Sequence, residues 1–159
     1  MKNIALSFII IAAIFSCVWA GDKKPLKAAP ADKCAVCGMF VAKYPDFLAQ
    51  IVFKDGSYAM FDGPKDMFKY YLNMKTYNPS KKVSDIDSVY VTDYYTLTAV
   101  DGLKAYFVIG SNINGPMGRE LIPFIKEADA REFMKDHNGR AIVRFSEVTS
   151  TTLRDIDSR

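Results

Sequence analysis

Two cysteines and a methionine lie within the segment 34–39, whose sequence is CAVCGM. Cysteines separated by two residues can form a disulfide in an oxidising compartment, act as a thioredoxin-like redox pair, or supply half of a metal site. A redox pair of that kind obtains its low thiol pKa from a helix that begins at the first cysteine. Gly38 and the apolar alternation after it argue against a helix at Cys34. The spacing therefore favours metal binding over redox chemistry, and a disulfide between Cys34 and Cys37 stays open.

Copper(I) fits the soft donor atoms of this sequence better than zinc does. A structural zinc site takes four ligands from cysteine and histidine, whereas the sequence beyond its apolar N-terminus offers only two cysteines and one histidine. That histidine, His137, follows a predicted helix, where the helix dipole favours an imidazolium, so we interpret it as a capping or solvent-exposed residue. Thiolate and thioether ligands together select Cu(I).

Met117 is a thioether whose position packing does not explain. It lies between Pro116 and Gly118 in a long loop, 110–119, where neither a helix nor a strand could bury it. Long loops in compact domains are usually functional or disordered. The structural alternative is that Met117 folds back over a sheet, because methionine is an adaptable filler of apolar gaps. In a sequence that also carries two closely spaced cysteines, we favour a role in metal binding.

Two parts of the chain share one order of predicted elements: strand, strand, helix, strand. In the first part, Asp55-Gly56 forms a hairpin turn, and Asp62 can cap a helix whose first turn contains Pro64. The predicted strands are 48–53, 57–61 and 89–91 in the first part and 104–109, 121–125 and 141–145 in the second, with helices at 64–72 and 128–136. We therefore predict an α+β fold of two similar ββαβ halves with mostly antiparallel sheets.

The connection between the first two strands distinguishes the halves. A tight Asp55-Gly56 turn in the first half corresponds to the long loop 110–119 in the second. Pro123 predicts that its strand lies at a sheet edge or carries a bulge. Asn138-Gly139 is expected to end the second helix, with Gly139 in the left-handed conformation. A small α+β domain can also show this order twice by chance, but the difference between the two connections would keep its functional meaning.

The first twenty residues are organised as a secretory signal peptide, 1–20. Lys2 provides a positive start, residues 4–15 form an apolar run, and Ala20 suits cleavage before Gly21. The run is shorter than the roughly 20 residues that a membrane-spanning helix needs. The alternative is a lipoprotein signal in which Cys17 becomes a lipid anchor to the membrane. Either version predicts export to the periplasm or cell envelope.

Composition limits the function classes further. A formal net charge of only +3 and the lack of an aromatic-basic recognition motif exclude nucleic-acid binding. No acid-base pair or nucleophile-base set is evident, so we do not predict an enzyme, and a thiol-disulfide oxidoreductase using Cys34 and Cys37 is the alternative. The predicted segments after the signal peptide are a linker at 21–33, the first half at 34–97, the second half at 98–148 and a C-terminal tail at 149–159.

Several motifs together resemble the NosL family, the accessory proteins of the nitrous oxide reductase system. The resemblance extends from about Cys34 to Val148. The motifs that carry it are CAVCGM at 34–39, DG at 55–56, FD at 61–62, YVTDY at 90–94 and GPMG at 115–118.

The resemblance implies a periplasmic Cu(I) chaperone, often lipid-anchored, that serves assembly of the copper centres of nitrous oxide reductase. The implied partners are nitrous oxide reductase and its copper-linked membrane transporter complex. The family's metal-binding cysteine corresponds to Cys37 and its methionine to Met117. Cys34 or Met39 could complete the site, because His137 does not fall in a matching motif. The family's two ββαβ halves are similar to the metal-handling part of organomercurial lyase.

Overall fold

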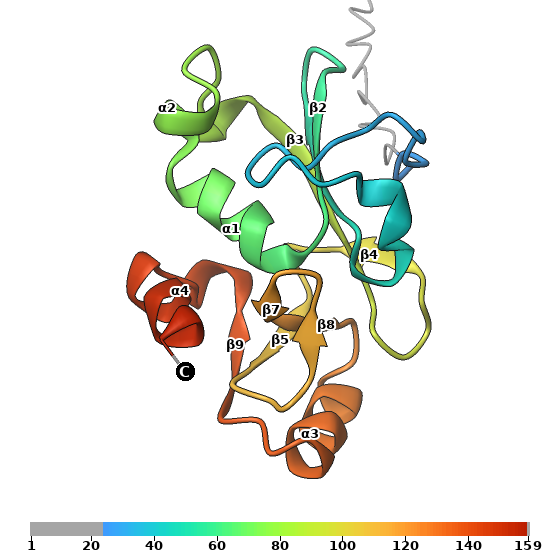
Figure 1. Ribbon diagram of the computed structural model, residues 1–159, viewed down its shortest axis with the longest axis vertical. Coiled ribbons are helices and arrows are strands. Elements are labelled where there is room, and N and C mark those ends of the chain that lie inside the picture. The colour runs from blue at the N-terminus through green and yellow to red at the C-terminus, as the bar shows by residue number, and fades with distance from the viewer. Residues whose placement is uncertain (1–23, 159) are drawn as a thin grey trace, which may run out of the picture.

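The computed structural model describes residues 24–158, so the predicted signal peptide at 1–20 and the lipid anchor at Cys17 lie outside the described residues. The first sheet is antiparallel, with the strand order β2-β1-β3-β4 (Figure 1). Its elements are β1 (Ala49–Phe53), β2 (Tyr58–Phe61), α1 (Pro64–Leu72), α2 (Met74–Tyr77), β3 (Ile86–Thr92) and β4 (Ala99–Asp101). Short 3-10 turns cover Val41–Lys43, Pro45–Phe47, Val83–Asp85 and Phe145–Glu147.

The second sheet repeats this plan with the strand order β8-β5-β9, again antiparallel. Its elements are β5 (Tyr106–Ile109), β8 (Ile122–Phe124), α3 (Glu127–Asp136) and β9 (Ala141–Arg144). The order β2-β1-β3 of the first sheet and β8-β5-β9 of the second are equivalent, and each has its helix before the last strand. The predicted pair of ββαβ halves is therefore confirmed. Pro123 lies on the edge strand β8, as expected for a residue without an amide hydrogen.

The two halves share one hydrophobic core. Phe68 of α1 contacts Phe107 of β5 and Phe145, with ring centroids 5.1 and 4.8 Å apart. A smaller cluster between α3 and its own sheet contains Phe124 and Phe133. Because the main cluster takes residues from both sheets, α1 is held in place by the second half as well as by the first.

The loop 110–119 has more structure than its length indicates. It contains a short hairpin of β6 (Asn114–Gly115) and β7 (Gly118–Arg119), with Gly115 paired to Gly118. Pro116 and Met117 form the tip of this hairpin, which lies beside the first turn of α1 (Figure 1). The second half thus has an ordered hairpin between β5 and β8, where the first half has only the tight Asp55-Gly56 turn between β1 and β2.

Residues 149–159, expected as a tail, include the helix α4 (Ser150–Asp157). Thr149 caps this helix by accepting a hydrogen bond from the amide of Thr152 at 3.2 Å. Leu153 and Ile156 lie one turn apart and bury one face of α4 in the main core. The sequence beyond the second half therefore contributes to the fold, and it also brings Asp157 to α1.

Two details at the helix ends differ from expectation. Asp62 does not cap α1; the N-cap is Gly63, which has no side chain, and Asp62 instead accepts a hydrogen bond from the thiol of Cys37. After α3, the residue in the left-handed conformation is Asn138, with φ of 54°, and not Gly139. Gly139 is needed for a different reason, because a Cβ there would lie 2.6 Å from Val108 Cγ1.

Glu120 of the second half takes the place of the missing cap. Its Oε1 accepts hydrogen bonds from the amides of Lys65 at 2.6 Å and Leu121 at 2.8 Å. A Cβ on Gly63 would lie 2.2 Å from Glu120 Oε2, so only glycine leaves room for the carboxyl group. Burial raises the pKa of Glu120 to about 8, although these two amide hydrogen bonds favour the charged form.

No helix among residues 24–158 has the length and apolar character required to cross a membrane.

The pKa of Glu120 predicts a pH-dependent stability. The folded state retains a proton that the unfolded state releases as the pH rises from about 4.5 to about 8, so the free energy of unfolding should fall across this window. Urea unfolding at several pH values would measure this slope. Glu120→Gln should flatten it, because glutamine keeps an acceptor for the amide of Lys65 and does not titrate. Equal slopes in the two proteins would contradict the assignment.

Candidate metal centre

A tight loop, not a helix, carries the two cysteines. The amide of Cys34 donates to the carbonyl oxygen of Met39 at 2.8 Å, and the amide of Gly38 donates to the carbonyl oxygen of Cys34 at 3.0 Å. Cys34 also forms an isolated parallel bridge with Met60, which fixes the loop beside β2. The absence of a helix at Cys34 agrees with the expectation that Gly38 disfavours one. Cys34 is 3% exposed, whereas Cys37 is half-buried.

Two carboxylates from the start of α1 face these thiols. The thiol of Cys34 donates to Asp66 Oδ2 at 3.3 Å, and that of Cys37 donates to Asp62 Oδ1 at 3.5 Å. Ligand atoms of all four residues lie within 4.8 Å of one another. Asp62 and Asp66 are four residues apart, which places them on one side of the first helical turn. Cysteines and carboxylates distant in sequence thus form one compact cluster.

The cluster lacks a partner for part of its polar surface. Both carboxylates are buried, and Asp62 Oδ2 has no hydrogen-bond partner within the described part of the chain. A buried acceptor without a donor is costly, and a buried carboxylate more so. Asp66 has Lys69 Nζ at 3.7 Å as a positive partner, and a cation bound among the four side chains would supply one for Asp62. The arrangement therefore fits a metal ion.

Burial raises the pKa of both thiols, and the carboxylates beside them raise it further. Both cysteines are free thiols in the structure. A metal ion must therefore displace protons when it binds, because the thiolate is the form that binds metals. Redox-active pairs of the thioredoxin type show the opposite shift, toward a lower thiol pKa.

Met117 is brought to the same end of α1, although not into the thiol cluster itself. Its carbonyl oxygen accepts a hydrogen bond from Lys65 Nζ at 2.9 Å, and Lys65 is the neighbour of Asp66. The residue is 46% exposed, so it does not fold back over the sheet as a core residue. The structure thus brings Cys34 and Cys37 together in one cluster as free thiols. It places the Met117 turn against the first turn of α1, beside the two carboxylates.

His137 lies away from this cluster, at the C-terminal end of α3. Its Nδ1 is 3.2 Å from Asn112 Oδ1, and its ring packs on Phe133 with centroids 4.3 Å apart. These contacts agree with the capping role expected of it.

The two aspartates are the part of the cluster that sequence reasoning missed. Asp62 was interpreted as a helix cap and Asp66 received no role. Their spacing could have revealed them: Asp62 and Asp66 are four residues apart around the predicted start of a helix, so their carboxylates can face the same side. Two carboxylates on one side of a helix start are a candidate metal site.

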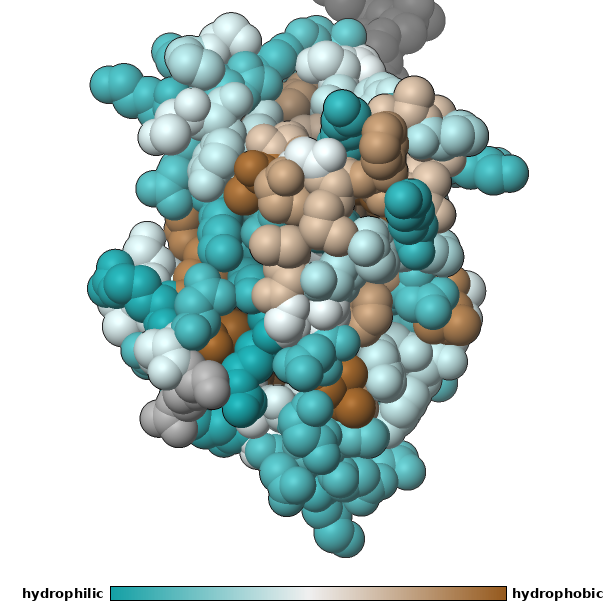
Figure 2. Space-filling model, in the orientation of Figure 1, coloured by the Kyte–Doolittle hydropathy of each residue, from teal (hydrophilic) through white to brown (hydrophobic). Residues whose placement is uncertain are grey.

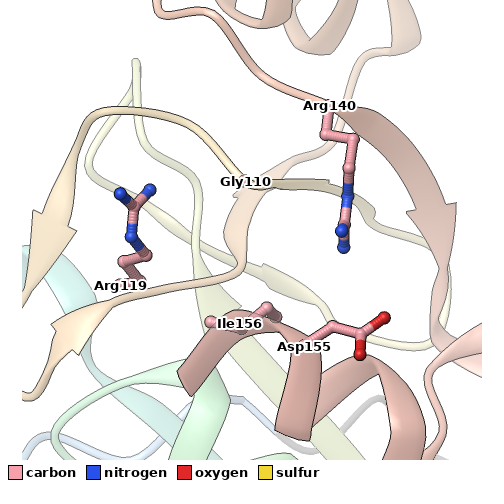
Figure 3. Close-up of a pocket in the computed structure, with 5 residues that line it drawn as sticks. All are labelled: Gly110, Arg119, Arg140, Asp155 and Ile156. Carbon is pink, nitrogen blue, oxygen red and sulfur yellow. The ribbon is translucent and has the colours of Figure 1, made fainter. Parts of the chain in front are cut away.

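The cysteine loop lies on a face of the molecule where apolar side chains gather. Figure 2 shows them on the upper half of this view, where Figure 1 places the segment containing residues 34–39 in front of β2 and α1. Phe40 at the end of this segment is exposed. A cavity of about 360 Å³ lies elsewhere, lined by Gly110, Arg119, Arg140, Asp155 and Ile156 (Figure 3), and it contains none of the four cluster residues. The four-residue cluster is therefore separate from this cavity, and it reaches the surface through the half-buried Cys37.

The fold and the cluster define a small α+β protein with a candidate metal site of two thiols and two carboxylates at the start of one helix. Comparison with known proteins places the chain in a family. The sequence model of the NosL family matches residues 25–153, so the chain belongs to the NosL family.

Two similar proteins illustrate this relationship. The copper-binding lipoprotein NosL of Stutzerimonas stutzeri is 26% identical over 167 residues, which cover 96% of this chain and 84% of that protein. The crystal structure of the copper chaperone NosL from Shewanella denitrificans matches with a TM-score of 0.70 and 24% identity, covering 81% of this chain and 98% of that chain. This structural match agrees with the α+β fold.

The raised pKa of Cys37 can be tested through the reactivity of its thiol. Asp62→Asn removes a negative charge beside Cys37, so the pKa of the thiol should fall and alkylation by iodoacetamide at neutral pH should become roughly two- to threefold faster. Mass spectrometry after timed quenching would follow each cysteine separately. Asp136→Asn on α3 is the matched control and should change nothing; unchanged alkylation in Asp62→Asn would rule out electrostatic coupling within the cluster.

Proposed function

We propose that this protein is an exported Cu(I) metallochaperone whose cargo is held by Cys37, Cys34 and Met117. The observation that supports it most directly is the cluster of two thiols and two buried carboxylates within 4.8 Å. The sulfur atoms supply soft ligands, which select Cu(I). The carboxylates supply negative charge that compensates a bound cation. Membership of a family whose relatives are named copper-binding proteins and copper chaperones supports the choice of metal.

The different exposure of the three sulfur residues favours transfer by ligand exchange. Cys34 is buried and serves as the fixed ligand, whereas Cys37 is half-buried and Met117 is exposed. A ligand from a partner protein can therefore approach the ion from the side of the exposed Met117. It would displace the thioether first and the Cys37 thiolate next. Cys34 is released last, when its buried thiolate takes up a proton, which its raised pKa favours.

The protein acts as a carrier and not as an enzyme in this proposal. The alternative, a thiol-disulfide oxidoreductase using Cys34 and Cys37, requires an activated thiolate at neutral pH. Burial and the neighbouring carboxylates raise the pKa of both thiols, which disfavours that chemistry.

We further propose nitrous oxide reductase as the client, with the copper-linked membrane transporter complex of that system as a second partner. The periplasmic location and a lipid anchor at Cys17 belong to the same proposal, and the name of the lipoprotein relative supports them. Co-expression of nitrous oxide reductase with this protein, in a host without another NosL family member, should raise the copper content of the reductase. Equal copper content with and without the protein would remove nitrous oxide reductase as the client.

The metal site is tested by Cu(I) affinity in variants of single sulfur residues. Competition against a chromogenic Cu(I) chelator under anaerobic conditions should show that Cys37→Ser and Met117→Ala each weaken binding. We expect roughly 100-fold for the thiolate and roughly 10-fold for the thioether, because the thiolate alone brings a negative charge to the ion. Met134→Ala on α3 is the control for loss of a methionine away from the cysteines, and it should leave Cu(I) affinity unchanged. Wild-type affinity in Met117→Ala would exclude Met117 from the site.

A further inference from the structure

Lys65 joins the Met117 turn to the helix that carries the carboxylates. Its ammonium group donates to the carbonyl oxygen of Met117 at 2.9 Å and pairs with Asp157 of α4 at 2.9 Å. The side chain is only 4% exposed, so these contacts are made in a setting where water competes little. One buried cation thus holds a turn of the second half and the end of α4 against the first turn of α1.

Glu120, which directly follows β7, makes a second contact with the first turn of α1. Its carboxyl group accepts the amide of Lys65 at 2.6 Å and fits between two glycines. A Cβ would lie 2.2 Å from Glu120 Oε2 at Gly63 and 3.0 Å from Glu120 Cγ at Gly115. Gly115 is paired to Gly118 across the turn that contains Met117. Two independent contacts, one through the Lys65 ammonium and one through Glu120, therefore set where the turn lies.

The contacts hold the backbone of Met117 and leave its side chain free. Met117 accepts its hydrogen bond from Lys65 through the carbonyl oxygen, whereas its thioether belongs to an exposed side chain. Such a geometry fixes the origin of the side chain relative to Asp62 and Asp66 while allowing the sulfur to swing toward or away from an ion. Orientation of a ligand by a residue that does not itself bind the metal is a common feature of metal sites.

We propose that Lys65 is a positioning residue that holds Met117 at the Cu(I) site, acting with Glu120. The proposal rests on the proposed Cu(I) function and adds a determinant of affinity outside the ligand set. Lys65 works through Met117, so its effect on copper binding requires the thioether to be present.

Charge and position predict opposite effects when Lys65 is removed. Lys65 is a cation near a site for a cation, so a purely electrostatic role means that Lys65→Leu strengthens Cu(I) binding. Loss of positioning means weaker binding, by about tenfold, the lower end of the range for residues that orient metal ligands. The sign of the change therefore separates the two roles.

A double-mutant cycle between Lys65→Leu and Met117→Ala tests the proposal, because leucine removes the charge without adding a sulfur ligand. Cu(I) affinities of the wild type, both single variants and the double variant would be measured by chelator competition. If Lys65 acts through Met117, Lys65→Leu weakens binding in the wild type and has no effect when Met117 is already alanine. Methionine methyl NMR provides a second readout: the Met117 resonance should shift on addition of Cu(I) in the wild type and shift less in Lys65→Leu.

Asp157→Asn is the matched control, because it removes the other partner of Lys65 and leaves the Met117 carbonyl bonded. It should keep Cu(I) affinity close to that of the wild type. Equal weakening by Lys65→Leu with and without Met117, stronger binding in Lys65→Leu, or an Asp157→Asn effect as large as that of Lys65→Leu would each overturn the positioning role. The proposed function fails separately if Met117→Ala itself leaves Cu(I) affinity unchanged, and Lys65 then has no ligand to position.

Discussion

The burial of two carboxylates against two thiols at the start of α1 is the interaction on which the rest of the structure depends. Asp62 and Asp66 cannot be solvated there, and the thiols can donate only one hydrogen bond each. The free protein therefore keeps the cysteines protonated, and Asp62 Oδ2 has no donor among residues 24–158. A cation bound in the cluster would compensate this cost. The proposed carrier role would use this difference, because the same cluster would have to accept an ion and later release it.

The two halves use one ββαβ plan for different purposes. The first half supplies the cysteine loop, the carboxylates and α1, and the shared core anchors them. The second half adds the β6–β7 hairpin and Glu120, which meet the first turn of α1 from the other side. The proposed site is thus divided between the two halves, with Cys34 buried and Met117 exposed. This difference in exposure suits the proposed ligand exchange, because a partner can reach the exposed ligand first.

Local patterns predicted the strands and the helix of each ββαβ half, because apolar alternation and close spacing act over a few residues. They did not predict α2, α4, β4 or the β6–β7 hairpin. Asp62 was mistaken for a cap because the competing partner, the Cys37 thiol, lies far away in sequence. Glu120 could not be assigned to α1 for the same reason: its contact with Lys65 spans 55 residues. The position of the Met117 turn depends on the same long-range contacts. Sequence patterns therefore identified the candidate soft ligands, while the charges and contacts around them emerged only from the three-dimensional packing.

X-ray absorption at the copper K-edge of the Cu(I)-loaded protein tests the central claim most directly, because it reports the atoms bound to the metal. The account predicts a low-coordinate shell dominated by sulfur, with less sulfur in Met117→Ala and less again when Cys37 is also replaced by serine. A shell of nitrogen and oxygen, or a sulfur shell that neither substitution changes, would contradict the convergence of these side chains on one copper ion.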